Sequence, residues 1–490
     1  MLFQSIEFLI FLPIVFALYW FVFKKLKAQN ALVLIASYVF YGWWDWRFLI
    51  LIAITSGFSY WSGLLIKNNE GKPKAQKWIC AGNIILNLLI LFAFKYLNFF
   101  SESLVALFAF FGIQLDWVTL KIILPVGISF YTFQALSYTI DVYRKKIEPT
   151  KDAVAFFAFI SFFPQLVAGP IERATNLLPQ FLKPRKFDYD AAVDGCRQML
   201  WGFFKKIVVA DNCAVYVNQV FENCQGQSGS TLALALILFA FQLYCDFSGY
   251  SDIAIGCAKQ FGIRLMRNFN YPYFATSFSD YWKRNHISLT TWFMDYVYYP
   301  MIGRSDKLWY WNLCMIITFL LSGLWHGANW TFVVWGLYQG VFIVISMNLG
   351  KKRKKFEKKH GLKNNRAYEF LCMFVTFFIV CIGLILFRAE SIGQAWEYVC
   401  GMMQFGTLKA FYRFFLPTDM WVWSKIWPTN LYIIIMLVVE WVQRKKEHGM
   451  DVAVLYKTLR WVIYIIVFFS TFVCFMKASY HPSDFIYFQF

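Results

Sequence analysis

One histidine stands between two apolar segments, where an imidazole could act on a substrate. His326 lies in the run Gly323-Leu324-Trp325-His326-Gly327-Ala328-Asn329-Trp330. A neutral imidazole, with a pKa of about 6.5, suits a general base that activates a hydroxyl group near neutral pH. If the segment is helical, Asn329 at i+3 shares a face with the imidazole. Gly323 and Gly327 permit close approach by a substrate or a neighbouring helix. A histidine that only packs between helices is an equally open interpretation.

A second histidine, His286, lies in the polar segment Asp280-Tyr281-Trp282-Lys283-Arg284-Asn285-His286-Ile287-Ser288, which we expect at a membrane boundary. By itself it could be merely interfacial. Upstream, Gln242-Leu243-Tyr244-Cys245-Asp246-Phe247-Ser248-Gly249-Tyr250-Ser251-Asp252 ends an apolar run with two carboxylates and several hydroxyls. These groups either cap a helix and bind neighbouring backbone or line an aqueous cavity. Composition does not decide between the two.

The other histidines and the common catalytic motifs provide no further candidate for catalysis. We expect His360 and His448, in basic loops, and His481, near the C-terminal end, to be solvated. The sequence has no Gly-x-Ser-x-Gly elbow, no phosphate-binding loop and no His-Glu-x-x-His helix, so a serine hydrolase, an ATPase and a zinc protease fit poorly. Eleven cysteines include no Cys-x-x-Cys pair, and most lie in apolar stretches, so we expect no metal site.

The elements that position these residues are apolar helices. The 490 residues are 59% hydrophobic and 15% charged, against about 25% charged in soluble domains, which excludes a soluble globular enzyme. Apolar runs near the ~20 residues needed to cross a bilayer recur throughout, so we predict one all-α polytopic membrane domain over residues 1–490. The first run lacks the features of a cleaved signal and is expected to be a retained helix. The candidate spans are Ile6–Phe23, Ala31–Trp44, Phe48–Ile66, Ile79–Leu97, Ile122–Tyr138, Ala153–Val167, Leu232–Tyr244, Trp311–Leu324, Thr331–Met347, Phe370–Phe387, Leu431–Val442 and Trp461–Met476.

The net charge of +19 is concentrated in short loops, which argues against nucleic acid as a partner. Residues 351–366 carry seven lysines and two arginines against one glutamate, a net +8. We interpret this run as a topology determinant with some attraction to anionic lipid, in preference to a specific partner site. Basic loops are expected in the cytoplasm, which places Asp45, Glu102, Asp116 and both termini outside. An even number of crossings then requires some segments to be re-entrant.

Two stretches depart from simple spans. Leu124-Pro125-Val126-Gly127 and the segment from Pro164 to Pro170 put helix breakers at membrane depth, which is tolerated only where the backbone is buried in protein or lines a cavity. Gly202-Phe203-Phe204-Lys205-Lys206-Ile207-Val208-Val209-Ala210-Asp211 mixes charge with apolar residues. It is typical of a helix lying at the membrane interface, with an ordinary cytoplasmic connector helix as the alternative.

Several of these blocks together resemble the membrane-bound O-acyltransferases, and most closely the branch that O-acetylates alginate and peptidoglycan. The resemblance rests on residues 124–134, 163–171, 244–252, 268–273 and 323–330, the segment around His286, Phe387-Arg388-Ala389-Glu390-Ser391 and the terminal Phe485-Ile486-Tyr487-Phe488. Family members commonly have Trp where Asn285 stands and often Arg where Met294 stands. Core motifs at 121–345 would be followed by C-terminal helices at 369–476.

The resemblance implies a ring of about 10–12 transmembrane helices and re-entrant segments around a central funnel. It further implies a multi-pass protein of the bacterial cytoplasmic (inner) membrane that takes an acetyl group from cytoplasmic acetyl-CoA, with no bound cofactor. The acetyl group would reach an extracytoplasmic polysaccharide, either alginate-like or peptidoglycan. A periplasmic or extracellular SGNH-type acetyltransferase/esterase would be the protein partner, and membrane lipid surrounds the chain.

His326 matches the catalytic histidine of the family and His286 its second motif histidine. We predict that His326 is the general base, with His286 and Asn329 orienting it or polarising the thioester carbonyl. Substrate-binding residues are predicted at Asn329, Trp325, Asp246, Ser248, Asn285 and Gln242, and no metal ligand is predicted. The alternatives are a relative that transfers D-alanine or a fatty acyl group to a lipid or protein, and a non-enzymatic transporter.

Overall fold

The computed structural model describes residues 1–114, 124–167, 169–404, 408, 410, 411 and 427–478. Within these residues every regular element is a helix and no strand occurs, which confirms the predicted all-α class. Their contacts divide the chain into two compact units, Met1–Cys196 with Ala254–Met266 and Arg197–Ile253 with Arg267–Phe490. Two of the three boundaries fall inside the helices α10 (Tyr189–Phe203) and α12 (Gly229–Gln260), and a single domain over residues 1–490 stays a prediction.

Many of the helices are long and apolar enough to cross a bilayer, so the polytopic membrane class is confirmed. In the described part of the chain seven stretches meet this standard: Trp46–Asn68, Pro73–Phe110, Gly229–Gln260, Leu308–His326, Trp330–Lys359, Arg366–Arg388 and Lys457–Met476. Shorter apolar helices cover Ile6–Val22, Ala153–Leu166 and Thr429–Val442. The ring with its funnel, the 10–12 crossings and the orientation of the termini stay predictions.

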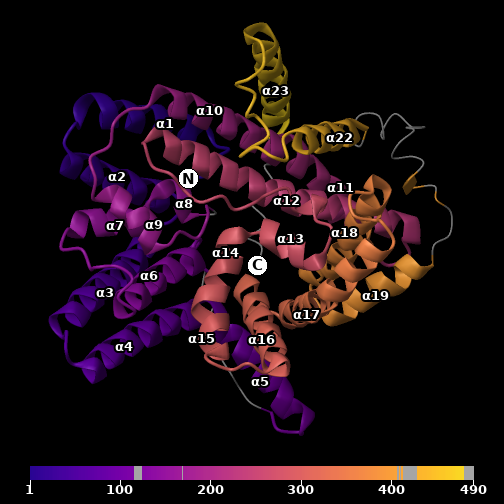
Figure 1. Ribbon diagram of the computed structural model, residues 1–490, viewed down its shortest axis with the longest axis horizontal. Coiled ribbons are helices and arrows are strands. Elements are labelled where there is room, and N and C mark those ends of the chain that lie inside the picture. The colour runs from indigo at the N-terminus through magenta and orange to yellow at the C-terminus, as the bar shows by residue number, and fades with distance from the viewer. Residues whose placement is uncertain (115–123, 168, 405–407, 409, 412–426, 479–490) are drawn as a thin grey trace. The chain divides into compact units, whose positions relative to one another are not determined.

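The first unit is built from helices that lie side by side (Figure 1). Contacts join α3 to α4, α6 and α7, and α2 to α7. The elements are α1 (Ile6–Ala17), η1 (Leu18–Val22), α2 (Leu26–Gly42), η2 (Trp46–Phe48), α3 (Leu49–Asn68), α4 (Pro73–Leu91), η3 (Phe92–Tyr96), α5 (Leu97–Phe110), α6 (Ile128–Tyr143), α7 (Ala153–Ser161), α8 (Phe163–Leu166), α9 (Ala174–Phe181) and the start of α10.

The predicted helix breaks occur in this unit, and their backbone is buried in protein. Gly127 precedes α6 with a φ of 76°, a left-handed conformation that glycine adopts without a steric penalty. A side chain there would also collide with the carbonyl oxygen of Leu166. The predicted span Ala153–Val167 is divided into α7 and α8, and residues 162–167 are buried. The predicted span Ile122–Tyr138 has its first two residues outside the described part, and its helix begins at Ile128.

The second unit holds both motif histidines. In it α16 and α17 form a closely packed hairpin, with α18 and α13 against α17 (Figure 1). Its elements are the end of α10, η4 (Phe204–Ala210), α11 (Asp211–Glu222), most of α12, η5 (Pro272–Phe274), α13 (Phe278–Arg284), α14 (Ile287–Phe293), η6 (Met294–Tyr298), α15 (Tyr299–Ile302), α16 (Leu308–His326), α17 (Trp330–Lys359), α18 (Arg366–Arg388), α19 (Ile392–Met403), α22 (Trp427–Val442) and α23 (Lys457–Ala478).

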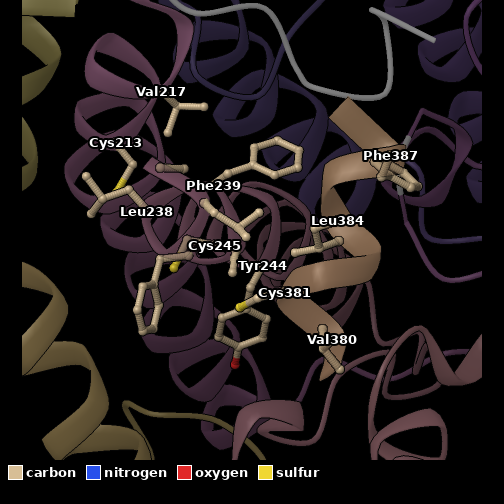
Figure 2. Packing of buried hydrophobic residues seen from close by; sticks show 14 of the residues in the cluster. Cys213, Val217, Leu238, Phe239, Tyr244, Cys245, Val380, Cys381, Leu384 and Phe387 are labelled. Carbon is tan, nitrogen blue, oxygen red and sulfur yellow. The ribbon is translucent and has the colours of Figure 1, made fainter. Parts of the chain in front are cut away.

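The hydrophobic core of this unit joins α12 to α11 and α18. Figure 2 shows Phe239 and Tyr244 of α12 close to Leu384 of α18, within a cluster of buried side chains. Phe387, at the end of α18, belongs to the same cluster, and its ring centroid lies 5.4 Å from that of His326. The core therefore extends to the catalytic candidate, and its packing holds the C-terminal end of α16 in place.

The interpretation of residues 202–211 as an amphipathic helix lying at the membrane interface is wrong, and the alternative of an ordinary cytoplasmic connector helix stays a prediction. Residues 204–210 form the π-helical turn η4, and all seven are buried. Lys205 and Lys206 are only 3% and 1% exposed because carboxylates of the same unit surround their ammonium groups. Burial of a charge is tolerated when it is paired, and the sequence pattern alone did not reveal that pairing.

Candidate active site

His326 is the last residue of α16, and close packing against α17 sets its position. A Cβ on Gly323 would lie 3.0 Å from the Cα of Gly336, and one on Gly327 would overlap the ring of Phe332. The glycines flanking His326 therefore accommodate the neighbouring helix, one of the two roles that the sequence allowed. The imidazole is 5% exposed, and the centroids of the Trp325 and Trp335 rings each lie 5.0 Å from its own.

The segment after His326 is not helical, so the argument that placed Asn329 on the face of the imidazole does not apply. Gly327 is extended, with φ of −159° and ψ of 149°, and Asn329 is the N-cap of α17. The Asn329 side-chain oxygen accepts from the backbone N–H of Thr331 at 3.0 Å. Its amide donates to the carbonyl of Glu390 at 3.0 Å. These bonds hold the α16–α17 turn, so Asn329 supports the position of His326 through the backbone.

His286 lies in the turn between α13 and α14 and has an unusual backbone. Its φ of 46° and ψ of 51° are left-handed, a conformation that non-glycine residues rarely adopt and that often occurs at functional sites. The side chain is 3% exposed. The ring of Phe247 from α12 meets the imidazole edge-on, with centroids 4.6 Å apart. The surrounding structure thus holds His286 in one orientation.

Asn268 fixes the tautomer of this histidine. The Asn268 Oδ1 atom accepts from the backbone N–H of Ser288 at 3.2 Å, which identifies it as the oxygen of the amide. His286 Nδ1 lies 3.2 Å from the same oxygen. Because a carbonyl oxygen only accepts, Nδ1 carries the proton and Nε2 keeps the lone pair. Asn268 Nδ2 in turn donates to Ser251 Oγ at 3.1 Å, which anchors the amide to α12.

Burial keeps the imidazole of His286 neutral. It lowers the pKa of His286 from 6.5 to about 3, because the charged form loses its hydration. A neutral ring whose only N–H points at Asn268 has no second proton to offer to a thioester carbonyl. The predicted role of polarising that carbonyl does not suit this tautomer, whereas accepting a hydrogen bond at Nε2 does.

The two motif histidines and one of the predicted substrate-binding residues come together. The ring centroids of His286 and His326 are 6.3 Å apart. Trp325 lies 6.0 Å from His286 and 5.0 Å from His326 by the same measure, so its ring borders both imidazoles. Asn285 precedes His286 in the same turn and is partly exposed. The imidazole of His326, surrounded by aromatic rings with little water access and next to the neutral His286, could pass a proton to or from a reacting group.

The predicted residues of α12 take part in a buried ionic network. Lys206 Nζ lies 2.7 Å from Asp246 Oδ1 and 2.8 Å from Asp211 Oδ1. Burial alone would lower the pKa of Lys206, but the Asp246 and Asp211 carboxylates raise it overall, so the ammonium stays charged. Lys205 Nζ lies 2.6 Å from Asp252 Oδ2 and donates to Ser248 Oγ at 3.0 Å. The polar residues at 246–252 thus pair with the lysines of η4. This differs from both arrangements that the sequence suggested, helix capping and the lining of an aqueous cavity.

The remaining candidates differ in their surroundings. Gln242 is buried in α12, and its side chain makes no hydrogen bond with another described residue. His360 is exposed, as predicted, whereas His448 is only 2% exposed, so its predicted solvation is wrong. The loop of His448 follows α22, and the ring of Trp201 lies against the neighbouring Gly449. His481, Asp116 and the terminal block Phe485-Ile486-Tyr487-Phe488 lie outside the described residues.

Sequence reasoning missed Asn268, Lys205 and Lys206 as parts of the site. Asn268 begins one of the blocks on which the family resemblance rests, yet nothing local pairs it with a histidine 18 residues away. The two lysines did carry a signal, since they stand together in an otherwise apolar run. That run was interpreted as amphipathic, although carboxylates further along the chain were available to pair with them.

Comparison with known proteins identifies the family. A model of the membrane-bound O-acyltransferase family matches residues 149–393, which include both motif histidines. The chain is 40% identical over 409 residues to "Probable alginate O-acetylase AlgI" of Pseudomonas aeruginosa, covering 83% of this chain and 76% of that protein. The chain belongs to the membrane-bound O-acyltransferase family. This confirms the resemblance that the sequence motifs carried.

Two further relatives of this membrane-bound O-acyltransferase have names that state other acceptors or acyl groups. "Peptidoglycan O-acetyltransferase" of Helicobacter pylori is 32% identical over 426 residues, covering 80% of this chain and 78% of that protein. "Teichoic acid D-alanyltransferase" of Bacillus subtilis is 27% identical over 346 residues, covering 68% of this chain and 84% of that protein. The protein is therefore a multi-pass membrane enzyme that transfers an acyl group from a donor to a hydroxyl acceptor.

Proposed function

We propose that this enzyme transfers an acetyl group from cytoplasmic acetyl-CoA for the O-acetylation of an extracytoplasmic polysaccharide, either alginate-like or peptidoglycan. One observation carries the proposal: two buried imidazoles, 6.3 Å apart by ring centroid, lie in a chain whose relatives include named O-acetylases. The relatives named as O-acetylases or O-acetyltransferases are 32–40% identical, and the D-alanyltransferase of Bacillus subtilis is 27% identical. We therefore favour acetyl over D-alanyl transfer.

In the proposed reaction His326 removes the proton of the attacking hydroxyl. The hydroxyl oxygen bonds to the thioester carbonyl carbon, the carbon–sulfur bond breaks, and the thiolate of CoA leaves and takes up the proton held by the imidazole. His286 remains neutral and offers the lone pair of Nε2, so it serves as a hydrogen-bond acceptor beside His326. The aromatic rings around His326 keep water scarce, which limits hydrolysis of the thioester.

The other predicted residues receive two kinds of role. Trp325 and Asn285, next to the histidines, are the proposed contacts with the reacting groups. Asn329 stabilises the turn that carries His326. Asp246 and Ser248, through their lysine partners, hold the part of α12 from which Phe247 packs against His286. Gln242 remains a candidate contact from the same helix.

The cellular arrangement belongs to the same proposal. The basic loops favour an enzyme of the bacterial inner membrane with both termini outside and acetyl-CoA approaching the positive cytoplasmic face. The acetyl group would reach the polymer through an SGNH-type acetyltransferase/esterase on the outer side. A fatty acyl transfer or a transport function would instead leave acetyl-CoA unused.

The test uses the purified full-length protein in lipid nanodiscs with acetyl-CoA labelled in the acetyl group. Label should pass to alginate-type oligosaccharides or glycan strands when the SGNH-type partner is present. His326→Ala should lower the rate by about 10²–10⁴-fold, as expected for loss of a general base. The exposed His360→Ala is the matched control and should retain activity. A folded His326→Ala variant with full activity, or transfer of D-alanine in place of acetyl, would overturn the proposal.

A further inference from the structure

A large groove in the second unit lies next to the candidate active site but contains neither motif histidine. Its volume is about 1140 Å³, somewhat above the ~300–1,000 Å³ typical of small-molecule pockets. Helices α13, α14, α16, α17 and α18 supply its walls. Large apolar side chains dominate the lining, among them Phe278, Trp282, Met315, Phe319, Phe342 and Ile379.

The groove follows α17 for a length that matches one leaflet of a bilayer. Its lining on this helix runs from Phe342 to Glu357, which corresponds to about 22 Å at ~1.5 Å per residue. Half of a bilayer, including its headgroup layer, is about 20–22 Å thick. On α18 the lining runs antiparallel, from Tyr368 to Ile379. An occupant could therefore extend from the headgroup region to near the middle of the membrane.

One end of the groove is basic and rigid. Arg353 donates through Nε to Glu357 at 2.7 Å and through one terminal nitrogen to the carbonyl of Thr276 at 2.5 Å. Its guanidinium lies 5.9 Å from the centre of the Tyr368 ring. Lys354 also lines this end, is exposed, and has no ion pair with the described part of the chain.

We propose that this groove binds an anionic phospholipid, with its phosphate at Arg353 and Lys354 and an acyl chain along Phe342 and Ile379. Charge and length together support this occupant: a negative headgroup suits the basic end, and a hydrocarbon chain suits the apolar remainder. The flanking run 351–366 has a net charge of +8 and is expected in the cytoplasm, so the lipid would come from the inner leaflet. Part of the basic run interpreted as a topology determinant thus forms a specific site.

The side chains that form the walls of the groove favour a lipid over the acyl donor as its occupant. Trp282 separates the groove from Trp335, which contacts His326: the two indole centroids are 6.0 Å apart, and Trp282 Nε1 donates to Gln339 Oε1 at 3.3 Å. A thioester held in this groove would be shielded from the imidazoles by these rings. A lipid there needs no access to them. It would instead stabilise the helices that carry the site, because α16 and α17 form two of the walls.

The test is lipid retention by the full-length protein in detergent, measured by native mass spectrometry during titration with dioleoylphosphatidylglycerol. We expect one molecule to bind with clear preference over zwitterionic dioleoylphosphatidylcholine. Lys354→Glu should weaken phosphatidylglycerol binding at least about tenfold, since each basic residue contributes about fivefold and the substitution also adds a negative charge. Lys355→Glu is the matched control, because it makes the same charge change on α17 outside the groove lining and should have little effect.

A second pair of variants fills the apolar part. Ile345→Trp places a bulky ring in the groove and should also reduce lipid retention, whereas Val341→Trp, at a similarly exposed α17 position outside the lining, should not. Equal binding of both lipids, or equal effects of Lys354→Glu and Lys355→Glu, would overturn the proposal. So would displacement of the lipid by CoA or by glycerol phosphate alone, which would indicate a donor or phosphate site. None of these readouts depends on acetyl transfer, so the lipid site and the proposed function can fail independently.

Discussion

Asn268 Oδ1 lies 3.2 Å from Nδ1 of His286 and also receives the backbone N–H and the hydroxyl of Ser288. Three donors therefore converge on one amide oxygen, and this oxygen decides which nitrogen of His286 carries the proton. His286 has a left-handed backbone, and Nδ1 of its imidazole faces Asn268. Asn268 is a positioning residue, because it acts on the chemistry only through the histidine.

Replacing Asn268 tests this relationship. Asn268→Leu removes the acceptor and should lower kcat roughly 100-fold, within the range for loss of acid–base assistance. Asn268→Asp keeps an acceptor and should retain more activity. Its negative charge would raise the pKa of His286 from about 3, so the acid limb of the kcat/KM profile should move to higher pH. Ser251→Ala, which removes only the partner of Asn268 Nδ2, is the control. Identical pH profiles for the native protein and Asn268→Asp would argue for a merely structural residue.

The buried carboxyl of Glu172 in the first unit should make stability depend on pH. Burial raises the pKa of Glu172 from 4.5 to about 7, although Met266 N–H and Asn176 donate to it. The folded state therefore holds a proton that the unfolded state releases, so stability is full below about pH 4.5 and falls as pH rises to about 7, by up to ~3 kcal/mol. Glu172→Gln should flatten this dependence in thermal unfolding scans between pH 5 and 8. Glu148→Gln, at an exposed carboxylate, should leave the dependence unchanged.

The paired lysines of η4 should contribute strongly to stability. Lys206→Met leaves Asp246 and Asp211 buried without their cation and should destabilise the protein by about 3–5 kcal/mol. The double variant Lys206→Met/Asp246→Asn should recover part of the loss, because one of the two uncompensated charges is removed. Chemical unfolding in detergent measures both. Lys67→Met, in an exposed ion pair, should change stability by less than about 1 kcal/mol. A single variant no less stable than the double would contradict the pairing.

Close packing of α16 on α17 should tolerate no side chain at Gly323. A Cβ there would collide with the carbonyl oxygen of Phe332 and press on Gly336. Gly323→Ala should therefore destabilise the hairpin by roughly 1–3 kcal/mol and lower activity by displacing His326. Gly82→Ala in α4 is the matched helical control, since nothing lies within 4 Å of the added atom. It should be neutral or slightly stabilising. Equal melting temperatures for the two variants would show that the hairpin adapts.

The sequence by itself determined the class of the protein and the pair of histidines. Apolar runs of membrane length are local properties of the chain, so the all-α polytopic class followed from composition and hydropathy. The blocks around His286 and His326 carried the family, which comparison confirmed. A histidine next to glycine at the end of an apolar run is visible without any tertiary contact.

Only the tertiary structure decided the surroundings of those histidines. Asn268 contacts His286, whose backbone is left-handed. Asp246 pairs with Lys206, 40 residues earlier in the sequence. Helix α16 ends at His326, and Asn329 caps the next helix. Each depends on which segments pack together, and hydropathy patterns do not specify partners for buried polar groups. Such groups must nevertheless be paired in a low-dielectric interior, so the fold assigned partners that local sequence could not show.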